Sequence, residues 1–329
     1  MTYLCCEQLK QGITFDIHGI RFCCRIDRSI NIQQIDTNCE IDINKYLSQR
    51  DFYLNEFRNG NIPKVCQGCS YLEKANKGHS NKIKFFSLAH ATICSCNCIY
   101  CEFTTDKKYY NTRKHYNVLK LIKTLHDNNL IEDQAIFNLL GGECTEYKDN
   151  EFENIIDFIS TNGHFAHIFT SGMFYSPIIA NILHSGNGNI YVSADSGTRE
   201  TFERIKQVKY YDKFWDNMKK YSAASTLNPN GFEGFVVMKY IIIPGINDNK
   251  EEFDAFINKC HEIGCKQISL SLEHKWWGEN RNKNVPENLL ELLVYMDKVA
   301  QPFIIEYIEG VLDIRLKTNN YTQTPEIKY

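Results

Sequence analysis

Three cysteines in one short segment constrain this chain more than any other feature. Cys94, Cys98 and Cys101 follow the spacing CxxxCxxC, and an aromatic residue, Tyr100, precedes the last of them. Fourteen cysteines in 329 residues would produce this spacing by chance in roughly one chain in forty. Three thiolates can hold three corners of a cubane iron–sulfur cluster, whereas a cluster used only for electron transfer normally takes four cysteines. The spacing therefore predicts a cluster with one iron left open to a small molecule.

Apolar runs alternate with amphipathic stretches after this segment. Strands are expected at residues 84–88, 135–140, 166–170, 189–193, 235–243 and 267–272, and helices at 117–129, 152–160 and 249–263. Asp248 or Asn249 is the expected N-cap of the last helix. A strand followed by a helix, repeated about six times, predicts parallel strands with right-handed crossovers. The fold class is therefore α/β, with active residues at the carboxyl ends of the strands.

Further motifs stand where expected strands end. Gly141-Gly142-Glu143 follows residues 135–140, Ser171 follows the next strand, and residues 190–197 and 239–248 contain the later strand ends. With the cysteine triple, these motifs resemble the radical S-adenosylmethionine (SAM) superfamily, in that family's order, over roughly residues 82–274. The resemblance implies a partial (β/α)6 TIM-like barrel whose [4Fe–4S] cluster is held by Cys94, Cys98 and Cys101. One departure is Cys144, which stands where the family commonly has proline after GGE.

The resemblance also implies the residues that contact SAM. The glycines and the carboxylate of the GGE motif would receive the SAM ammonium, the backbone of the aromatic residue in the cysteine loop would lie near adenine, and strand-end polar groups would bind the ribose. Lys206 would meet the SAM carboxylate, although its neighbour Arg204 competes for that assignment. The complete predicted set is Tyr100, Gly141, Gly142, Glu143, Ser171, Ser193, Asp195 and Lys206.

The amino-terminal segment carries its own cysteines, at Cys5-Cys6, Cys23-Cys24 and Cys66-Gln-Gly-Cys69. Their spacing around Gly19 resembles SPASM or twitch auxiliary-cluster domains, which usually follow the core rather than precede it. The resemblance implies a second [4Fe–4S] cluster, with Cys6, Cys24, Cys66 and Cys69 as ligands. Only one member of each adjacent pair can face the cluster, because neighbouring side chains on an extended segment point oppositely, and the choice within each pair stays open. Zinc is the alternative occupant, since CxxC also suits a tetrahedral site.

Composition and the order of the motifs predict the domain limits, the excluded function classes and the location of the protein. The expected domains are an auxiliary-cluster domain at 1–75, the core at 82–285, and a helix/strand extension at 286–329. A net charge of −3 gives no global electrostatic case for nucleic acid, and no apolar run is long enough for a membrane span. The amino terminus lacks the layout of a signal peptide, and cysteines in CxxC clusters are typical of metal binding in a reducing compartment. These features together predict a cytoplasmic protein.

The implied function is reductive cleavage of SAM to a 5′-deoxyadenosyl radical, which abstracts hydrogen from a substrate. Relatives with auxiliary clusters often act as oxidoreductases on peptide or protein side chains, and others act on sugars or small metabolites. An electron donor such as flavodoxin or ferredoxin would be needed. Glu273 and His274, followed by two tryptophans, are the candidate substrate-facing residues. The other hypotheses are an activase that places a radical on a partner enzyme and a non-catalytic iron–sulfur or zinc protein, which would not need the GGE motif.

Overall fold

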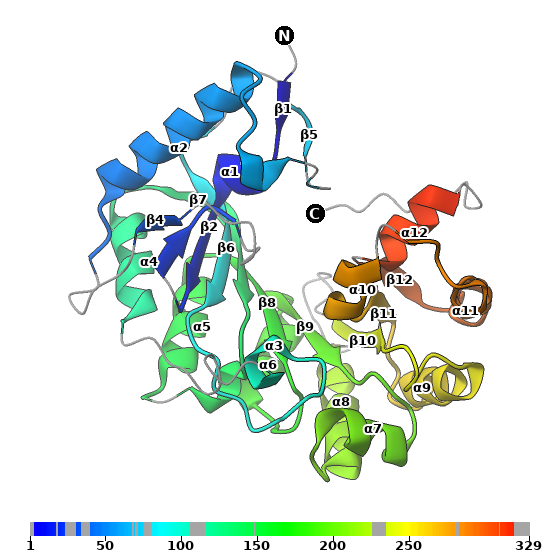
Figure 1. Cartoon of the computed structure of the whole chain (residues 1–329). Coiled ribbons are helices and arrows are strands. Elements are labelled where there is room, and N and C mark those ends of the chain that lie inside the picture. Colours follow the sequence, from blue (N-terminus) through cyan, green and yellow to red (C-terminus); the bar gives the residue numbers. More distant parts are fainter. Residues whose placement is uncertain are drawn as a thin grey trace. The chain divides into compact units, whose positions relative to one another are not determined.

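The computed structural model describes residues 3–17, 19–23, 31–33, 40–67, 69, 72–75, 80–105, 116–147, 149–225, 235–280, 283–308 and 310–318. The contacts between residues divide the chain into two compact units (Figure 1). The first unit comprises Met1–Cys94 and Asn111–Phe169, and the second comprises Ser95–Tyr110 and Thr170–Tyr329. The boundary therefore passes through the CxxxCxxC segment. The domain limits expected from the sequence, at 1–75, 82–285 and 286–329, differ from the bounds of these two units and stay predictions.

The first unit is built on a mainly parallel sheet with the strand order β8-β7-β6-β2-β3-β4. Strands β2, β6, β7 and β8 run parallel, while β3 pairs antiparallel with both β2 and β4. A separate antiparallel pair joins β1 to β5. The bounds are β1 (Tyr3–Cys5), β2 (Gly12–Asp16), β3 (Gly19–Arg21), β4 (Asn31–Gln33), β5 (Glu73–Ala75), β6 (Ile83–Ala89), β7 (Ile131–Leu139) and β8 (Phe165–Thr170).

Apolar stripes attach the helices of this unit to its sheet. Phe86 of β6 stacks on Phe137 of β7 with ring centroids 4.3 Å apart, and Phe158 of α5 contacts Phe137 edge-on. Even-numbered residues of β6 therefore face the helix layer, and the intervening residues face the opposite side. The helical segments are α1 (Glu7–Gln11), α2 (Ile43–Arg58), η2 (Lys64–Cys66), α4 (Val118–Asp127), η3 (Cys144–Glu146) and α5 (Glu151–Thr161).

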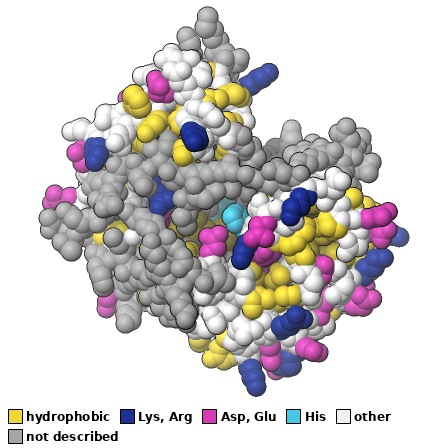
Figure 2. Space-filling view, viewed as in Figure 1, with side chains coloured by type: hydrophobic (Ala, Val, Ile, Leu, Met, Phe, Trp, Pro, Cys, Tyr) yellow, Lys and Arg dark blue, Asp and Glu magenta, His cyan; other side chains and the backbone are white. Residues whose placement is uncertain are grey.

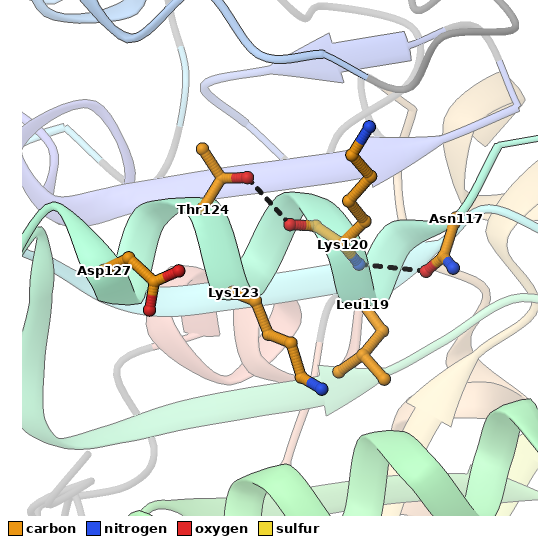
Figure 3. A pocket seen from close by; sticks show the side chains of 6 residues that line it. All are labelled: Asn117, Leu119, Lys120, Lys123, Thr124 and Asp127. Atoms are coloured by element: carbon orange, nitrogen blue, oxygen red, sulfur yellow. Dashed lines mark hydrogen bonds between the residues drawn. The ribbon is translucent and has the colours of Figure 1, made fainter.

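Helix α4 shows how the sequence sets an element's limits. The Asn117 side chain accepts the Lys120 N–H at 2.9 Å and so caps the first turn, while Val118, Leu121 and Ile122 are fully buried. Its polar side borders a shallow hollow of about 370 Å³ (Figure 3). The hollow is lined by this one helix and includes none of the sequence motifs.

The second unit contains four consecutive parallel strands in the order β12-β11-β10-β9. The Tyr240 ring of β10 lies 5.3 Å from Phe253 and 5.0 Å from Phe256, both on α9. Helix α9 therefore covers the face to which the even-numbered residues of β10 point. The strands are β9 (Gly188–Ser193), β10 (Val236–Ile242), β11 (Gln267–Leu272) and β12 (Ile304–Tyr307). The helices are α3 (Glu102–Thr105), α6 (Pro177–Ser185), α7 (Arg199–Lys206), α8 (Tyr211–Ser225), α9 (Lys250–Glu262), α10 (His274–Asn280), α11 (Glu287–Val299) and α12 (Val311–Thr318).

The strands and helices predicted for the core are confirmed within a few residues at each end. Asn249, one of the two expected caps, accepts the Glu252 N–H at 2.9 Å. In the described part of the chain, no helix is both long and apolar enough to cross a membrane. Figure 2 shows Lys and Arg side chains interspersed with Asp and Glu on the described part of the face that it draws, without an extended basic patch there.

Candidate active site

The second half of the cysteine loop is fastened to the end of α7. The backbone N–H groups of Asn97 and Ile99 donate to the carbonyl oxygens of Lys206 and Ile205, at 3.2 and 3.0 Å. Within the loop, the Cys101 N–H donates to the Cys98 carbonyl oxygen at 3.1 Å. The hydroxyl of Thr104, on α3, donates to the same oxygen at 2.7 Å. These bonds hold Cys98 and Cys101 on one turn beside the carboxyl end of α7.

A buried ion pair meets the aromatic residue of this loop. Lys206 Nζ lies 2.6 Å from Asp195 Oδ2, and the Tyr100 hydroxyl donates to the same oxygen at 2.7 Å. The Lys206 ammonium also donates to the Tyr100 hydroxyl at 2.8 Å. Burial lowers the pKa of Lys206, but the Asp195 carboxylate and the nearby Cys98 together outweigh burial and hold that pKa above its ordinary value. We call Tyr100, Asp195 and Lys206 the loop clamp, because they join the cysteine loop to β9 and α7.

Asp195 is positioned by an unusual backbone conformation. Its φ of +60° lies in the left-handed region, which non-glycine residues rarely adopt. Its Oδ1 accepts the Ile241 N–H at 2.9 Å, and its carbonyl accepts the Asn247 side-chain amide at 2.7 Å. The carboxylate is therefore hydrogen-bonded through both oxygens within the protein, at the point where β9 and β10 end.

The clamp also affects the chemistry of the loop thiols. A hydrogen bond from Cys96 lowers the pKa of Cys98, burial raises it, and the Lys206 ammonium lowers it again, which brings it to about 6. The thiolate is the form of cysteine that binds metals. The lowered pKa of Cys98 therefore fits a thiolate ligand of the iron–sulfur cluster that the sequence predicts.

In the first unit, the GGE motif folds against the segment that leads into Cys94. The Glu143 N–H donates to the Ile93 carbonyl at 2.6 Å. Gly141 and Gly142 have φ of +76° and +49°, and a Cβ on Gly142 would lie 2.3 Å from the Ile93 carbonyl oxygen. Only glycine permits this approach of two backbone segments.

The turn after GGE, where Cys144 replaces the common proline, is a short 3-10 helix over Cys144–Glu146. The Glu143 carboxylate is fully buried and accepts the Thr145 N–H at 3.1 Å and the Thr145 hydroxyl at 2.7 Å. Burial raises the pKa of Cys144 well above its ordinary range, and the Glu143 carboxylate raises it further.

The other predicted site residues lie in the second unit. The Ser171 hydroxyl accepts the Met173 N–H at 3.4 Å, and Ser193 is the last residue of β9. Glu273 uses its carboxylate to cap α10, accepting the N–H groups of Lys275 and Trp276 at 2.9 and 2.6 Å. His274 is largely exposed and lies 3.5 Å from Glu102. A substrate role for Glu273 and His274 stays a prediction.

The amino-terminal cysteines come together in the first unit from three segments. Cys6 caps α1, accepting the Leu9 N–H at 3.4 Å, and Cys66 and Cys69 form a turn closed by a 3.1 Å backbone hydrogen bond. Burial raises the pKa of Cys6 to about 12, and the charges of Cys5, Cys23 and Cys66 raise it too. The same effect of burial and neighbouring cysteines raises the pKa of Cys66 to about 11. These thiols are close enough to disfavour one another's ionisation.

The ligand choice at the second adjacent pair is not decided by these contacts. Cys23 follows β3 and acts electrostatically on Cys6 and Cys66, whereas the predicted ligand, Cys24, lies outside the described residues. Among the residues that the structure describes, no three His, Cys, Asp or Glu side chains converge tightly enough to hold a single metal ion. A donor set of Cys6, Cys66, Cys69 and one member of the pair at 23–24 would consist of thiols alone, which suits an iron–sulfur cluster and a tetrahedral zinc site alike, and both occupants stay predictions.

Sequence reasoning missed several members of the site. The side chain of Tyr100 forms the clamp, while the expected place of its backbone near adenine stays a prediction, and Asn247 and the buried Cys96 support Asp195 and Cys98. The polar Asn247 within an apolar strand-end run could have indicated a site residue. Its partner, Asp195, stands 52 positions earlier and could not be identified from the sequence.

Comparison with solved structures shows the same fold. SuiB from Streptococcus suis bound to S-adenosylmethionine matches with a TM-score of 0.54 at 13% identity, covering 83% of this chain and 58% of that one. SuiB bound to its precursor peptide SuiA matches with a TM-score of 0.53 at 12% identity, covering 97% of this chain and 75% of that one. The predicted fold class, an α/β core of the radical SAM partial-barrel kind, is thereby confirmed.

A curated protein also matches part of the sequence. The GTPase Obg of Brachyspira hyodysenteriae is 27% identical over 213 residues, which are 59% of this chain and 28% of that protein. The chain thus spans about a quarter of the length of this relative and about three-fifths of the length of the SuiB chain bound to S-adenosylmethionine. The activities of those whole proteins are therefore not assigned to this chain. The family model of the radical SAM superfamily matches residues 88–273, which include the cysteine triple, the GGE motif and the clamp. Since this match covers more than half of the sequence, the chain belongs to the radical SAM superfamily.

Proposed function

We propose that this protein cleaves SAM reductively and uses the resulting radical to modify a peptide or protein side chain. The family match over residues 88–273 carries the first part of the proposal, because it contains all three cluster cysteines at the family's spacing. When bound, the cluster supplies one electron that divides SAM into methionine and a 5′-deoxyadenosyl radical, and this radical takes a hydrogen atom from the substrate. The protein's own task is to position the two reactants and exclude water.

Some residues of the chain would bind SAM, and others would hold the cysteine loop in position. Gly141, Gly142 and Glu143 offer close backbone approach and a carboxylate for the SAM ammonium. Ser171 and Ser193 offer hydroxyls from strand ends for the ribose. Asp195 and Lys206 are bonded to each other and to Tyr100, so we assign them first to holding the loop in place and only through it to SAM.

The amino-terminal cysteines would hold a second cluster. Cys6, Cys66 and Cys69, with Cys23 or Cys24, supply four thiols, and electrostatic coupling among the described thiols supports their proximity. A protein electron donor such as flavodoxin or ferredoxin would reduce the protein, and the predicted location is the cytoplasm. The peptide substrate is supported by SuiB, which was solved with its precursor peptide.

The test is formation of 5′-deoxyadenosine by the anaerobically reconstituted chain with SAM and dithionite. We expect product from the wild type and none above background from Cys98→Ala, because a cluster that lacks one of its three ligands is not retained. Cys260→Ala removes a buried thiol of α9 outside the motifs and serves as the matched control. Equal product from Cys98→Ala and the wild type would refute the proposed function.

A further inference from the structure

Aromatic rings and lysine side chains gather on one surface of the second unit. The Lys213 ammonium nitrogen lies 4.6 Å from the ring centroid of Phe174 and 5.3 Å from that of Tyr210. The rings of Phe174 and Tyr210 meet edge-on, with their centroids 6.2 Å apart. The Lys220 ammonium nitrogen lies 5.4 Å from the ring centroid of Tyr175. We call these five residues the aromatic–lysine patch.

The patch faces solvent although most of its residues are aromatic. Tyr175 is 41% exposed and Tyr210 is 37% exposed, and both lysines are exposed as well. In the described part of the chain, neither Lys213 nor Lys220 forms an ion pair. Exposed apolar side chains that gather, rather than lie singly, mark interaction sites, and tyrosine is enriched in protein interfaces.

The charges around the patch are predominantly positive. Lys209 and Lys219, next to the patch in sequence, are also exposed. Helix α8 carries two aspartates: Asp212 accepts a hydrogen bond from Arg199, and Asp216 is exposed. Between residues 209 and 220, four exposed lysines therefore outnumber the one aspartate that is not paired with an arginine. A protein that complements this surface presents carboxylates.

Helix α8 holds the aromatic side of the patch in a fixed conformation. The Asn217 side-chain amide donates to the Gly172 carbonyl oxygen at 3.0 Å. The Tyr221 hydroxyl accepts the Ser176 N–H at 2.7 Å, and the Tyr221 ring stacks on Tyr175 with centroids 5.1 Å apart. These contacts fix the loop after β8 to α8. A surface that already has its binding conformation loses less entropy when a partner docks.

The patch also lies beside the cysteine loop. The backbone of that loop donates to the last carbonyl oxygens of α7, and Tyr210 follows Lys206 by four residues, a span of at most about 14 Å. The Phe202 ring of α7 lies 5.0 Å from the Phe214 ring of α8, so the helix that holds the loop and the helix that carries the lysines are packed together (Figure 1). A protein docked on the patch is therefore close to the cysteine loop.

Position and charge together select an electron donor as the partner. The proposed function consumes one electron for each SAM, and this electron comes from outside the chain. Complexes that transfer electrons bury little surface, and complementary charges speed their association. Single-stranded nucleic acid also uses aromatic rings and lysines, but it needs open ring faces for stacking. Here a lysine ammonium lies over each of the three rings.

We propose that the aromatic–lysine patch is the docking site of an acidic electron-donor protein, whose carboxylates meet Lys213 and Lys220. The reduced flavin or iron–sulfur centre of the donor gives one electron to the cluster at the cysteine loop. The donor is oxidised by one electron and the cluster is reduced by one, so no bond forms or breaks in this step. This inference rests on the proposed function and adds to it the partner and its contact surface.

The first test measures donor binding directly. A flavodoxin and a [2Fe–2S] ferredoxin of negative net charge, both oxidised, are titrated into the full-length reconstituted chain in a calorimeter at low and high salt. The wild type should bind at least one of them, with a Kd that rises with salt because screening weakens charge pairs. Lys213→Glu with Lys220→Glu in one chain should raise that Kd at least tenfold, since two attractive pairs become repulsive.

Lys283→Glu with Lys298→Glu is the matched control, because it makes the same change of net charge at exposed lysines of the second unit. Lys298 is on α11, which lies apart from α8 in Figure 1, and this variant should bind the donor like the wild type. Formation of 5′-deoxyadenosine then connects binding to electron delivery. With dithionite, a small reductant that needs no docking site, the patch variant should match the wild type. With subsaturating reduced donor protein, it should be at least tenfold slower.

The other outcomes separate the docking site from the proposed function. An equal Kd for the patch and control variants, or a wild type that binds neither donor, overturns the docking site. Loss of the dithionite-driven product in the patch variant would assign the lysines to the fold, and binding of a single-stranded RNA oligomer that only the patch variant loses, with donor binding unchanged, would assign them to nucleic acid; both overturn the proposal. A wild type that contains its cluster and forms no 5′-deoxyadenosine with dithionite refutes the proposed function itself, whereas the calorimetric result does not depend on SAM cleavage.

Discussion

At the scale of single residues, the loop clamp joins groups that the chain keeps far apart. Tyr100 and Lys206 are 106 positions apart, and both contact Asp195 at hydrogen-bond distance. Lys206 is 3% exposed and Asp195 is fully buried. A buried ion pair gains little over apolar packing, but removing one partner leaves an uncompensated charge. The clamp therefore makes the position of the cysteine loop depend on each of its members.

Lys206→Met should lower the free energy of unfolding by about 3 kcal/mol, the order of magnitude for breaking a buried ion pair. The midpoint of urea denaturation measures this change. Adding Asp195→Asn to the same chain should recover part of the loss, because the stranded carboxylate is then neutral.

Arg204→Met is the control for this prediction, because Arg204 stands two residues earlier on α7 with its side chain exposed. Its denaturation midpoint should match that of the wild type. Equal losses in the Arg204 and Lys206 variants would mean that the buried pair does not stabilise the loop.

Site residues with a local signature could be predicted from the sequence, whereas their partners could not. The cysteine triple and the GGE motif are short patterns whose chemistry follows from residue type and spacing. The side chain of Tyr100 binds residues that come near it only once β9 and α7 have folded. Asp195 has a left-handed backbone conformation that the local sequence does not predict.

At the scale of elements, one carboxylate connects two helices of the second unit. Glu252, in the first turn of α9, accepts hydroxyl hydrogen bonds from Ser196, Thr198 and Thr201 at 2.6 to 2.7 Å. Thr198 is the N-cap of α7, and Asn249 caps α9. A negative charge near the amino ends of two helices also interacts favourably with their dipoles. Glu252 thereby sets the start of α7 against the start of α9.

Glu252→Ala should lower the free energy of unfolding by about 2 kcal/mol, since three hydroxyls lose a charged acceptor. Glu252→Gln should lose less, because the amide oxygen still accepts. Glu251→Ala, at the exposed neighbouring position, provides the comparison in the same urea denaturation series. A Glu252→Ala variant as stable as Glu251→Ala would show that the hydroxyls are satisfied without the carboxylate.

Long apolar strands and periodic helices could be predicted, and short or connecting elements could not. Strands such as β7 and β11 carry enough buried residues for their pattern to be evident, and α9 carries a clear cap. By contrast, β3 and β4 have three residues each, too few for a period of two to be distinguished. Nothing local in Gly12–Asp16 indicates that β2 pairs in parallel with β6, because that contact depends on the whole unit.

At the scale of the whole molecule, the amino-terminal segment belongs to the same compact unit as the first strands of the core. Strand β2 extends the sheet beside β6, and β1 pairs with β5 just after the Cys66–Cys69 turn. The auxiliary-cluster domain expected at 1–75 stays a prediction beside this shared sheet. Helix α1, which Cys6 caps, leads directly into β2 of this sheet, whereas β5, which follows the Cys66–Cys69 turn, belongs to the separate two-stranded sheet.

This arrangement makes the metal content of the chain a test of its organisation. Anaerobically reconstituted wild type should contain about eight iron and eight sulfide atoms per chain, as expected for two cubane clusters. Cys66→Ala with Cys69→Ala should reduce both to about four and leave a cluster that SAM still perturbs in electron paramagnetic resonance spectra, because Cys94, Cys98 and Cys101 are untouched. Cys260→Ala with Cys265→Ala removes two buried thiols from the second unit and should leave about eight of each. Zinc in place of the missing iron, or about four iron atoms in the wild type, would instead favour a single cluster and a zinc-binding amino-terminal site.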